Sequence, residues 1–101
     1  MGERDAMSVN RSLFDLGARL GSLEGYLYAE ERVEKNYLPG WIGNVEHEFE
    51  NLPAEIRSEI AGSYAEVWRK VEALLMRLYG NADATTLQAK AILSRLKERS
   101  V

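Results

Sequence analysis

One short segment of the sequence holds the residue types that could bind a metal ion. In Glu46–Glu50 the only histidine of the chain, His47, lies among three glutamates. On a helix Glu46 and Glu50 would share a face, and imidazole together with carboxylates can bind zinc, iron or manganese. Carboxylate-bridged di-iron bundles, however, use Glu-x-x-His pairs on facing helices, and here Asn44 stands three residues before the histidine. A metal-binding bundle that uses Glu46, His47 and Glu50 is therefore only the third functional interpretation, and no cofactor is expected.

Catalytic constellations are not evident elsewhere in the sequence. The chain has no cysteine, which excludes a thiolate nucleophile, a disulfide scaffold and a thiolate metal site. No Ser/His/Asp order, glycine-rich phosphate loop or Walker pattern can be drawn from its residues. Glu30, Glu31 and Glu34 have helical spacing, where carboxylates ordinarily form a solvated face or pair with basic side chains. We therefore expect a protein that is not an enzyme.

Charge is unevenly distributed along the chain. Residues 1–68 hold six Lys/Arg and thirteen Asp/Glu, whereas residues 69–101 hold seven Lys/Arg and three Asp/Glu. This division favours antiparallel contacts, within a chain or between copies, although it would equally suit two solvated faces. The basic part also suggests a small regulatory bundle that binds nucleic acid or another ligand, which is the second interpretation. Nucleic acid is the less expected partner, because the acidic part would repel phosphates and no helix-turn-helix is evident.

A ridge of small residues is the most unusual feature. It repeats every four positions and consists of Gly17, Gly21, Gly25 and Ala29. Each glycine inside a helix costs about 1 kcal/mol relative to alanine, so we expect an offsetting contact with a closely approaching backbone. Phe14 and Tyr28 would flank the resulting groove. The first expectation is packing against the second long helix of the same chain, the next is a homodimer contact, and a ligand groove or no role comes last.

Two long amphipathic helices should carry these features. The first is predicted from Ser8 towards Asn36, and the second from Pro53 to Tyr79. A narrow apolar seam follows the first helix: Val9, Leu13, Leu16, Leu20, Leu23 and Leu27. A wider stripe follows the second: Ile56, Ile60, Tyr64, Val67, Trp68, Val71, Leu74, Leu75 and Leu78. Because the two helices have similar lengths, we expect them to pack as an antiparallel pair.

The connection between them, residues 36–44, is predicted to be a loop. Leu38 precedes Pro39, which disfavours helical angles, and the next residue is a glycine. The apolar residues of this segment are Tyr37, Leu38, Trp41 and Ile42. We expect them to cover one end of the bundle, with a partner-binding surface as the alternative. Short helices are predicted at 45–51 and after Asp83, where Thr85 and Gln88 resemble a capping box.

Together these patterns predict a single all-α domain over residues 1–101, with a flexible N-terminus at 1–7. It should be a helical bundle of two long antiparallel helices plus one or two short ones, completed by dimerisation. No apolar stretch is long enough to span a membrane and no signal peptide is evident, so a cytoplasmic location is expected. The first functional interpretation is a non-enzymatic interaction or scaffold protein that self-associates. Its candidate interface residues are Phe14, Gly17, Gly21, Gly25, Tyr28, Tyr37, Leu38, Trp41 and Ile42.

Overall fold

Four helices make up the fold in the computed structural model, which describes the backbone of residues 3–29 and 35–99 and the side chains of residues 9–29 and 35–98. The helices are α1 (Glu3–Tyr28), α2 (Leu38–Glu50), α3 (Ala54–Tyr79) and α4 (Ala84–Arg99), and the 3-10 turn η1 (Lys35–Tyr37) precedes α2. No strand occurs among the described residues, so the predicted all-α bundle is confirmed. The helix α1 begins at Glu3, before the expected start at Ser8, and ends at Tyr28 rather than near Asn36.

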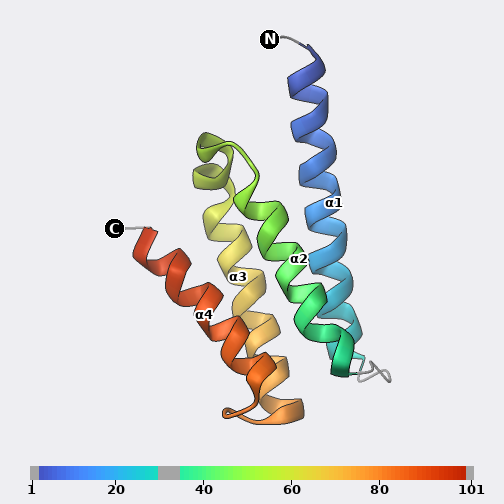
Figure 1. Cartoon of the computed structure of the whole chain (residues 1–101), viewed down its shortest axis with the longest axis vertical. Helices are drawn as coiled ribbons and strands as arrows, with labels where there is room; N and C mark the ends of the chain where they lie inside the picture. The colour runs from blue at the N-terminus through green and yellow to red at the C-terminus, as the bar shows by residue number, and fades with distance from the viewer. Residues whose placement is uncertain (1–2, 30–34, 100–101) are drawn as a thin grey trace.

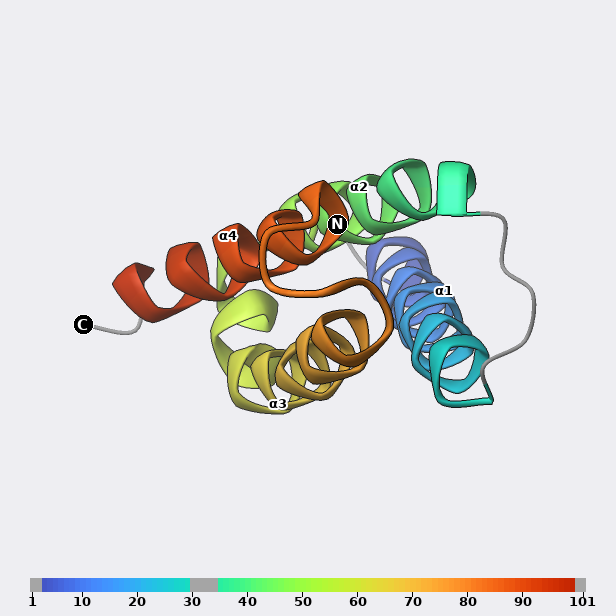
Figure 2. The same ribbon diagram turned by 90° about the horizontal axis from the view of Figure 1, so that it is seen from below.

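The helices form two layers and alternate in direction along the chain (Figure 1). Seen from below, α2 and α4 lie in one layer and α1 and α3 in the other (Figure 2). Both α1 and α4 pack against each of α2 and α3. The two long helices, α1 and α3, therefore run in the same direction, and the expected antiparallel pairing of these helices is wrong. The reason is that α2 is a third substantial helix, and it occupies the antiparallel position beside α1.

The core is built from one buried stripe on each helix. In α1 the stripe is the last four residues of the predicted seam, Leu16, Leu20, Leu23 and Leu27, while Val9 and Leu13 are half-buried. In α3 it is Tyr64, Trp68, Val71 and Leu75, which all belong to the predicted stripe. In α4 it is Ala89, Ile92 and Leu96. Burial of such side chains is the main favourable term in folding, at about 1.5–3 kcal/mol for a large aliphatic residue.

The predicted loop at 36–44 is wrong, because α2 is helical from Leu38 onward. Its stripe consists of Leu38, Ile42, Val45 and Phe49, spaced by four, three and four residues and all buried. Pro39 is tolerated because it stands in the first turn, where a backbone N–H has no acceptor within the helix. Gly40 and Gly43 each cost about 1 kcal/mol, less than the burial of the stripe contributes. Tertiary packing thus outweighs the local turn signals.

The extra length of α2 also changes the argument for a dimer. With only a short helix at 45–51, the apolar stripes of α1 and α3 would lack cover, and a second copy would have to supply it. Leu38 and Ile42 are fully buried, however, so α2 covers this part of the core within one chain. The four helices of a single copy therefore bury the described core residues without a second chain.

Aromatic side chains connect α2 with α3 near the α2–α3 connection. The rings of Phe49 and Tyr64 stack with centroids 3.9 Å apart, and Trp68 meets Tyr64 edge-on at 6.2 Å. Stacked and edge-on rings are both favourable arrangements for aromatic pairs. Burial raises the pKa of the Tyr64 phenol, because the phenolate would lose its hydration there. These rings are therefore core residues, as predicted for the aromatic side chains of the second long helix.

Asp83 joins the end of α3, the start of α4 and the segment before α2. Its Oδ2 accepts a hydrogen bond from the backbone N–H of Thr85 at 3.0 Å, so Asp83 caps α4. Thr85 was expected to be the cap with Gln88 completing the box, but Thr85 is buried and Gln88 donates to the carbonyl oxygen of Pro39 instead. Lys35 donates to Oδ1 of Asp83. This contact, together with the Thr85 N–H, holds the pKa of the Asp83 carboxyl below its usual range.

We predict that Asp83→Asn removes a pH-dependent part of the stability. The folded pKa of Asp83 is lowered, so its stabilisation is present above the ordinary carboxyl pKa of about 3.9 and is lost as the pH falls through the folded value. Asparagine can still cap α4 but carries no charge for Lys35. Urea unfolding between pH 3 and 7 should show the variant less stable near neutrality and the difference shrinking in acid. A difference that stays constant over this range would contradict the prediction.

Candidate interaction surface

The glycine ridge of α1 faces solvent. Gly17, Gly21 and Gly25 are all exposed, and a Cβ atom added at any of them would meet no described atom within 4 Å. The first expectation, that the ridge packs against the second long helix of the same chain, is therefore wrong. The cause is the rotation of α1 about its axis. Its leucine seam turns towards the other helices, and the ridge lies on the opposite side of the helix.

Large aromatic side chains stand at both ends of this ridge. Phe14 and Tyr28 are each 75% exposed, the highest exposures among the large apolar side chains that the structure describes. Between them, Ala18 and Ser22 are also exposed and complete the surface. We call these seven residues the glycine face: Phe14, Gly17, Ala18, Gly21, Ser22, Gly25 and Tyr28. Ala29, the last member of the predicted ridge, is exposed just beyond the end of α1.

The glycine face carries no charge. From residue 12 to residue 29, the only charged side chain among the exposed positions is Arg19, and it pairs with Glu48 of α2 at 2.5 Å. The other long helix, α3, has the usual charged solvent side: Glu55, Glu59, Glu66, Arg69, Lys70 and Arg77 are all exposed. A surface helix ordinarily carries charged residues opposite its buried stripe. Within one chain, α3 follows this rule and α1 departs from it.

The glycine face also carries an energetic cost that the chain itself does not offset. Three glycines inside a helix cost about 3 kcal/mol relative to alanines. Alanine would fit at each position, because the space beside the backbone is open. Exposed aromatic rings at both ends add apolar surface in contact with water. A second backbone that approaches this face closely would use the missing side chains and cover the rings.

The segment Tyr37–Ile42 provides a smaller exposed surface than expected. Leu38 and Ile42 are fully buried, so as core residues they cannot serve as contact residues in the folded protein. Tyr37 is exposed, and Trp41 is half-buried. The predicted partner-binding surface is thus reduced to Tyr37 and the outer edge of Trp41.

Trp41 holds α2 against α1. Its Nε1 donates a hydrogen bond to the backbone carbonyl oxygen of Arg19 at 3.2 Å, and its ring meets Tyr26 edge-on with centroids 5.7 Å apart. The Arg19–Glu48 ion pair joins the same two helices. These contacts lie on the α2 side of α1 and help to set the rotation that turns the glycine face outward.

The acidic segment Glu46–Glu50 engages basic side chains. Glu46 accepts hydrogen bonds from Arg95 of α4, whose Nε lies 3.0 Å away, and Glu50 accepts from Nη1 of Arg57 at 3.1 Å. His47 is exposed. No three His, Cys, Asp or Glu residues in the described part of the chain are arranged to hold a metal ion. The other acidic group considered, Glu30, Glu31 and Glu34, lies outside the described residues.

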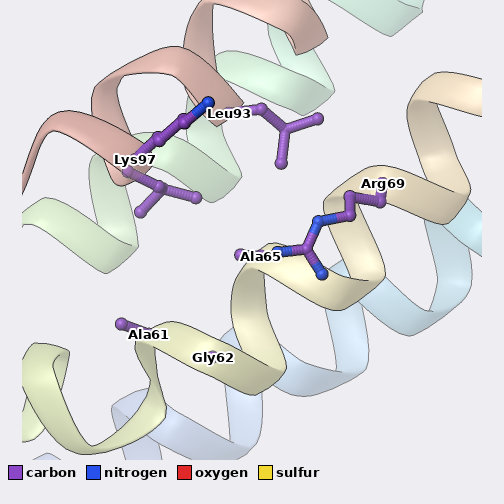
Figure 3. A pocket seen from close by; sticks show the side chains of 7 residues that line it. Ala61, Gly62, Ala65, Arg69, Leu93 and Lys97 are labelled. Atoms are coloured by element: carbon purple, nitrogen blue, oxygen red, sulfur yellow. The ribbon is translucent and has the colours of Figure 1, made fainter. Parts of the chain in front are cut away.

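The basic C-terminal part is divided between an internal ion pair and a groove. Arg95 pairs with Glu46, so one contact between the basic and acidic parts forms within a single chain. Arg69 and Lys97 instead line a groove of about 460 Å³ between α3 and α4 (Figure 3). Apolar and small residues make up the rest of its lining: Ala61, Gly62, Ala65, Leu93 and Leu96. This groove was not predicted from the sequence, where its one local signal is the spacing of Ala61, Ala65 and Arg69 along one side of α3.

Comparison of the chain with known protein families, with curated proteins and with solved structures finds no match. Among the described helices, none combines the length and the apolar character needed to cross a membrane.

We predict that Gly21→Ala stabilises the isolated chain by about 1 kcal/mol, because the added methyl group meets open space and alanine favours the helix. Urea unfolding at a protein concentration low enough to keep the chain monomeric measures the change. Gly80→Ala is the matched control and should destabilise, because Gly80 has φ +90°, a conformation that L-residues adopt only with strain. Destabilisation by Gly21→Ala under these conditions would show that the position is packed.

Proposed function

We propose that this chain is a non-enzymatic, cytoplasmic interaction or scaffold protein that self-associates through the glycine face of α1. The observation that carries the proposal is an exposed helix face with three unpacked glycines, two exposed aromatic rings and no charge. The charged solvent side of α3 in the same chain supports the proposal. The overall composition of the chain does not by itself explain an uncharged helix face, because α3 has charged residues on its solvent side.

The chemistry of the glycine face suits another protein helix. It offers two hydroxyls, from Ser22 and Tyr28, and otherwise only backbone, methyl groups and aromatic rings. Small residues at four-residue spacing let two helix backbones approach closely, which increases the van der Waals contact between them. Aromatic side chains are the commonest anchors of protein interfaces because they bury a large area with few rotatable bonds. A face of this kind is complementary to a second uncharged helix.

The area of such a contact predicts a moderate affinity. Each buried aromatic contributes about 150 Å², so the four rings of two copies remove about 600 Å² from water. With the backbone and small side chains between them, the contact reaches about 1,000 Å², near the lower bound for a specific interface. We therefore expect an exchange between monomer and dimer and not an obligate dimer. This expectation agrees with the burial of the core residues within one chain.

We predict that light scattering of the wild-type chain gives a mass that rises with concentration towards twice 11.4 kDa. Gly21→Leu should remain near the monomer mass, because the leucine side chain prevents close approach at the centre of the face. Gly62→Leu is the matched control: Gly62 is also an exposed glycine of a long helix with open space beside it, but it lies on α3. This control should dimerise like the wild type. A wild-type mass of one chain at every concentration, or equal loss of dimer in both variants, would refute the proposal.

The groove between α3 and α4 favours a second candidate function, binding of a long-chain carboxylate. Arg69 comes from α3 and Lys97 from α4 (Figure 3), the other lining residues are small or apolar, and no acidic residue is among the lining. A hydrocarbon chain would bury apolar area while the two cations receive the carboxylate. This arrangement supports the interpretation of the basic C-terminal part as a ligand site.

We predict that a fluorescent fatty acid binds the wild-type chain and that Arg69→Glu together with Lys97→Glu weakens binding at least tenfold, since both charge contacts become repulsive. Lys70→Glu, an exposed charge reversal outside the lining of this groove, is the control and should leave affinity unchanged. Equal binding by all three proteins would exclude the groove.

A further inference from the structure

The glycine face has a symmetric order of residues about Gly21. Gly17 and Gly25 lie four residues to either side of Gly21, and Phe14 and Tyr28 lie seven residues to either side. All five positions are exposed on one side of α1. Read in either direction along the helix, these five residues are an aromatic ring, a glycine, the central glycine, a glycine and an aromatic ring, whereas Ala18 and Ser22 of the glycine face have Glu24 and Leu20 at the mirrored positions.

This order suits an antiparallel contact with an identical helix, because it places residues of the same kind opposite one another. When two copies of a helix pack antiparallel about a two-fold axis, a residue at a given distance before the axis faces the residue at the same distance after it. An axis at Gly21 brings Gly21 of one copy against Gly21 of the other, Gly17 against Gly25, and Phe14 against Tyr28. A contact with an unrelated protein would place no such condition on the sequence of this face.

We infer that two copies pair antiparallel through their α1 helices about a two-fold axis at Gly21, with Phe14 of each copy against Tyr28 of the other. This inference rests on the proposed function and adds the direction and the register in which the two copies pair. The three glycines let the backbones approach at the centre, and an aromatic pair closes each end, about 10 Å from the axis at 1.5 Å per residue.

The charges and the position of α1 agree with this arrangement. A face that packs on its own copy must not repel itself, and the glycine face carries no charge between its two aromatic ends. Moreover, α1 stands at an edge of the two-layer bundle, so its outer side is free to meet another molecule (Figure 2).

The absence of cysteine makes the arrangement directly testable by crosslinking. Phe14→Cys, Tyr28→Cys and Gly21→Cys each introduce a single thiol, and circular dichroism checks that each variant is folded. The variants are treated with a short bis-maleimide reagent at a concentration where light scattering shows each variant, as well as the wild-type chain, to be dimeric. We expect Gly21→Cys to crosslink to itself. An equimolar mixture of Phe14→Cys and Tyr28→Cys should give at least fivefold more crosslinked dimer than either alone, because two thiols at position 14 lie about 21 Å apart in an antiparallel pair.

Each other outcome identifies what has failed. Self-crosslinking of Phe14→Cys with no gain in the mixture would show a parallel pair, which overturns this inference and leaves self-association intact. A wild-type dimer in which none of the three variants crosslinks would overturn both the antiparallel pair and the glycine face as the contact. A wild-type chain that stays monomeric at every concentration would refute the proposed function and this inference with it.

Discussion

The structure depends on the burial of α2 between α1 and α4. Its four core side chains, Leu38, Ile42, Val45 and Phe49, are each at most 2% exposed and come from a segment rich in helix-breaking residues. The apolar stripes of α1 and α4 both pack against this helix. Without α2, α1 would have no antiparallel neighbour, and its leucine seam would be partly exposed to water. The stability of the bundle thus comes from packing more than from helix propensity.

The two sides of α1 have different roles in this arrangement. One side supplies four buried leucines and receives Trp41, whose indole donates to the Arg19 carbonyl oxygen. These contacts fix the rotation of the helix. The other side is the glycine face, where a Cβ atom added at any of the three glycines would meet no described atom within 4 Å. The interactions that complete the core therefore also determine which residues are presented to a partner.

The sequence was sufficient to predict the elements whose pattern is regular. The leucine seam of α1 and the stripe of α3 repeat at steps of three and four without interruption, so periodicity alone identified them. The helix α2 was missed because Pro39-Gly40 signals a turn locally, whereas the burial of Leu38 and Ile42, which outweighs that signal, depends on residues far along the chain. The cap of α4 was misplaced for a similar reason: Thr85 fits a capping box, but it is buried and Asp83 forms the cap.

For the candidate site, sequence spacing found the ridge but not its orientation. Whether Gly21 faces the core or the solvent depends on the rotation of α1, which is set by contacts such as Trp41 with Arg19, residues 22 positions apart. The groove at Arg69 and Lys97 joins residues from two helices, and no local motif marks such a site. The absence of charge along one side of α1 was visible in the sequence and was the best available sign of an unpartnered surface.

The glycines of α1 have a dynamic consequence. Without side chains, they leave the adjacent backbone hydrogen bonds open to water on the outer side of the helix. In addition, the first turns of α1 project beyond the α2–α3 connection (Figure 1). Local opening of a helix begins where exposed backbone hydrogen bonds and few buried contacts coincide. The amides of α1 should therefore exchange with solvent before those of α3, so the less protected of the two long helices is also the one that presents the uncharged face.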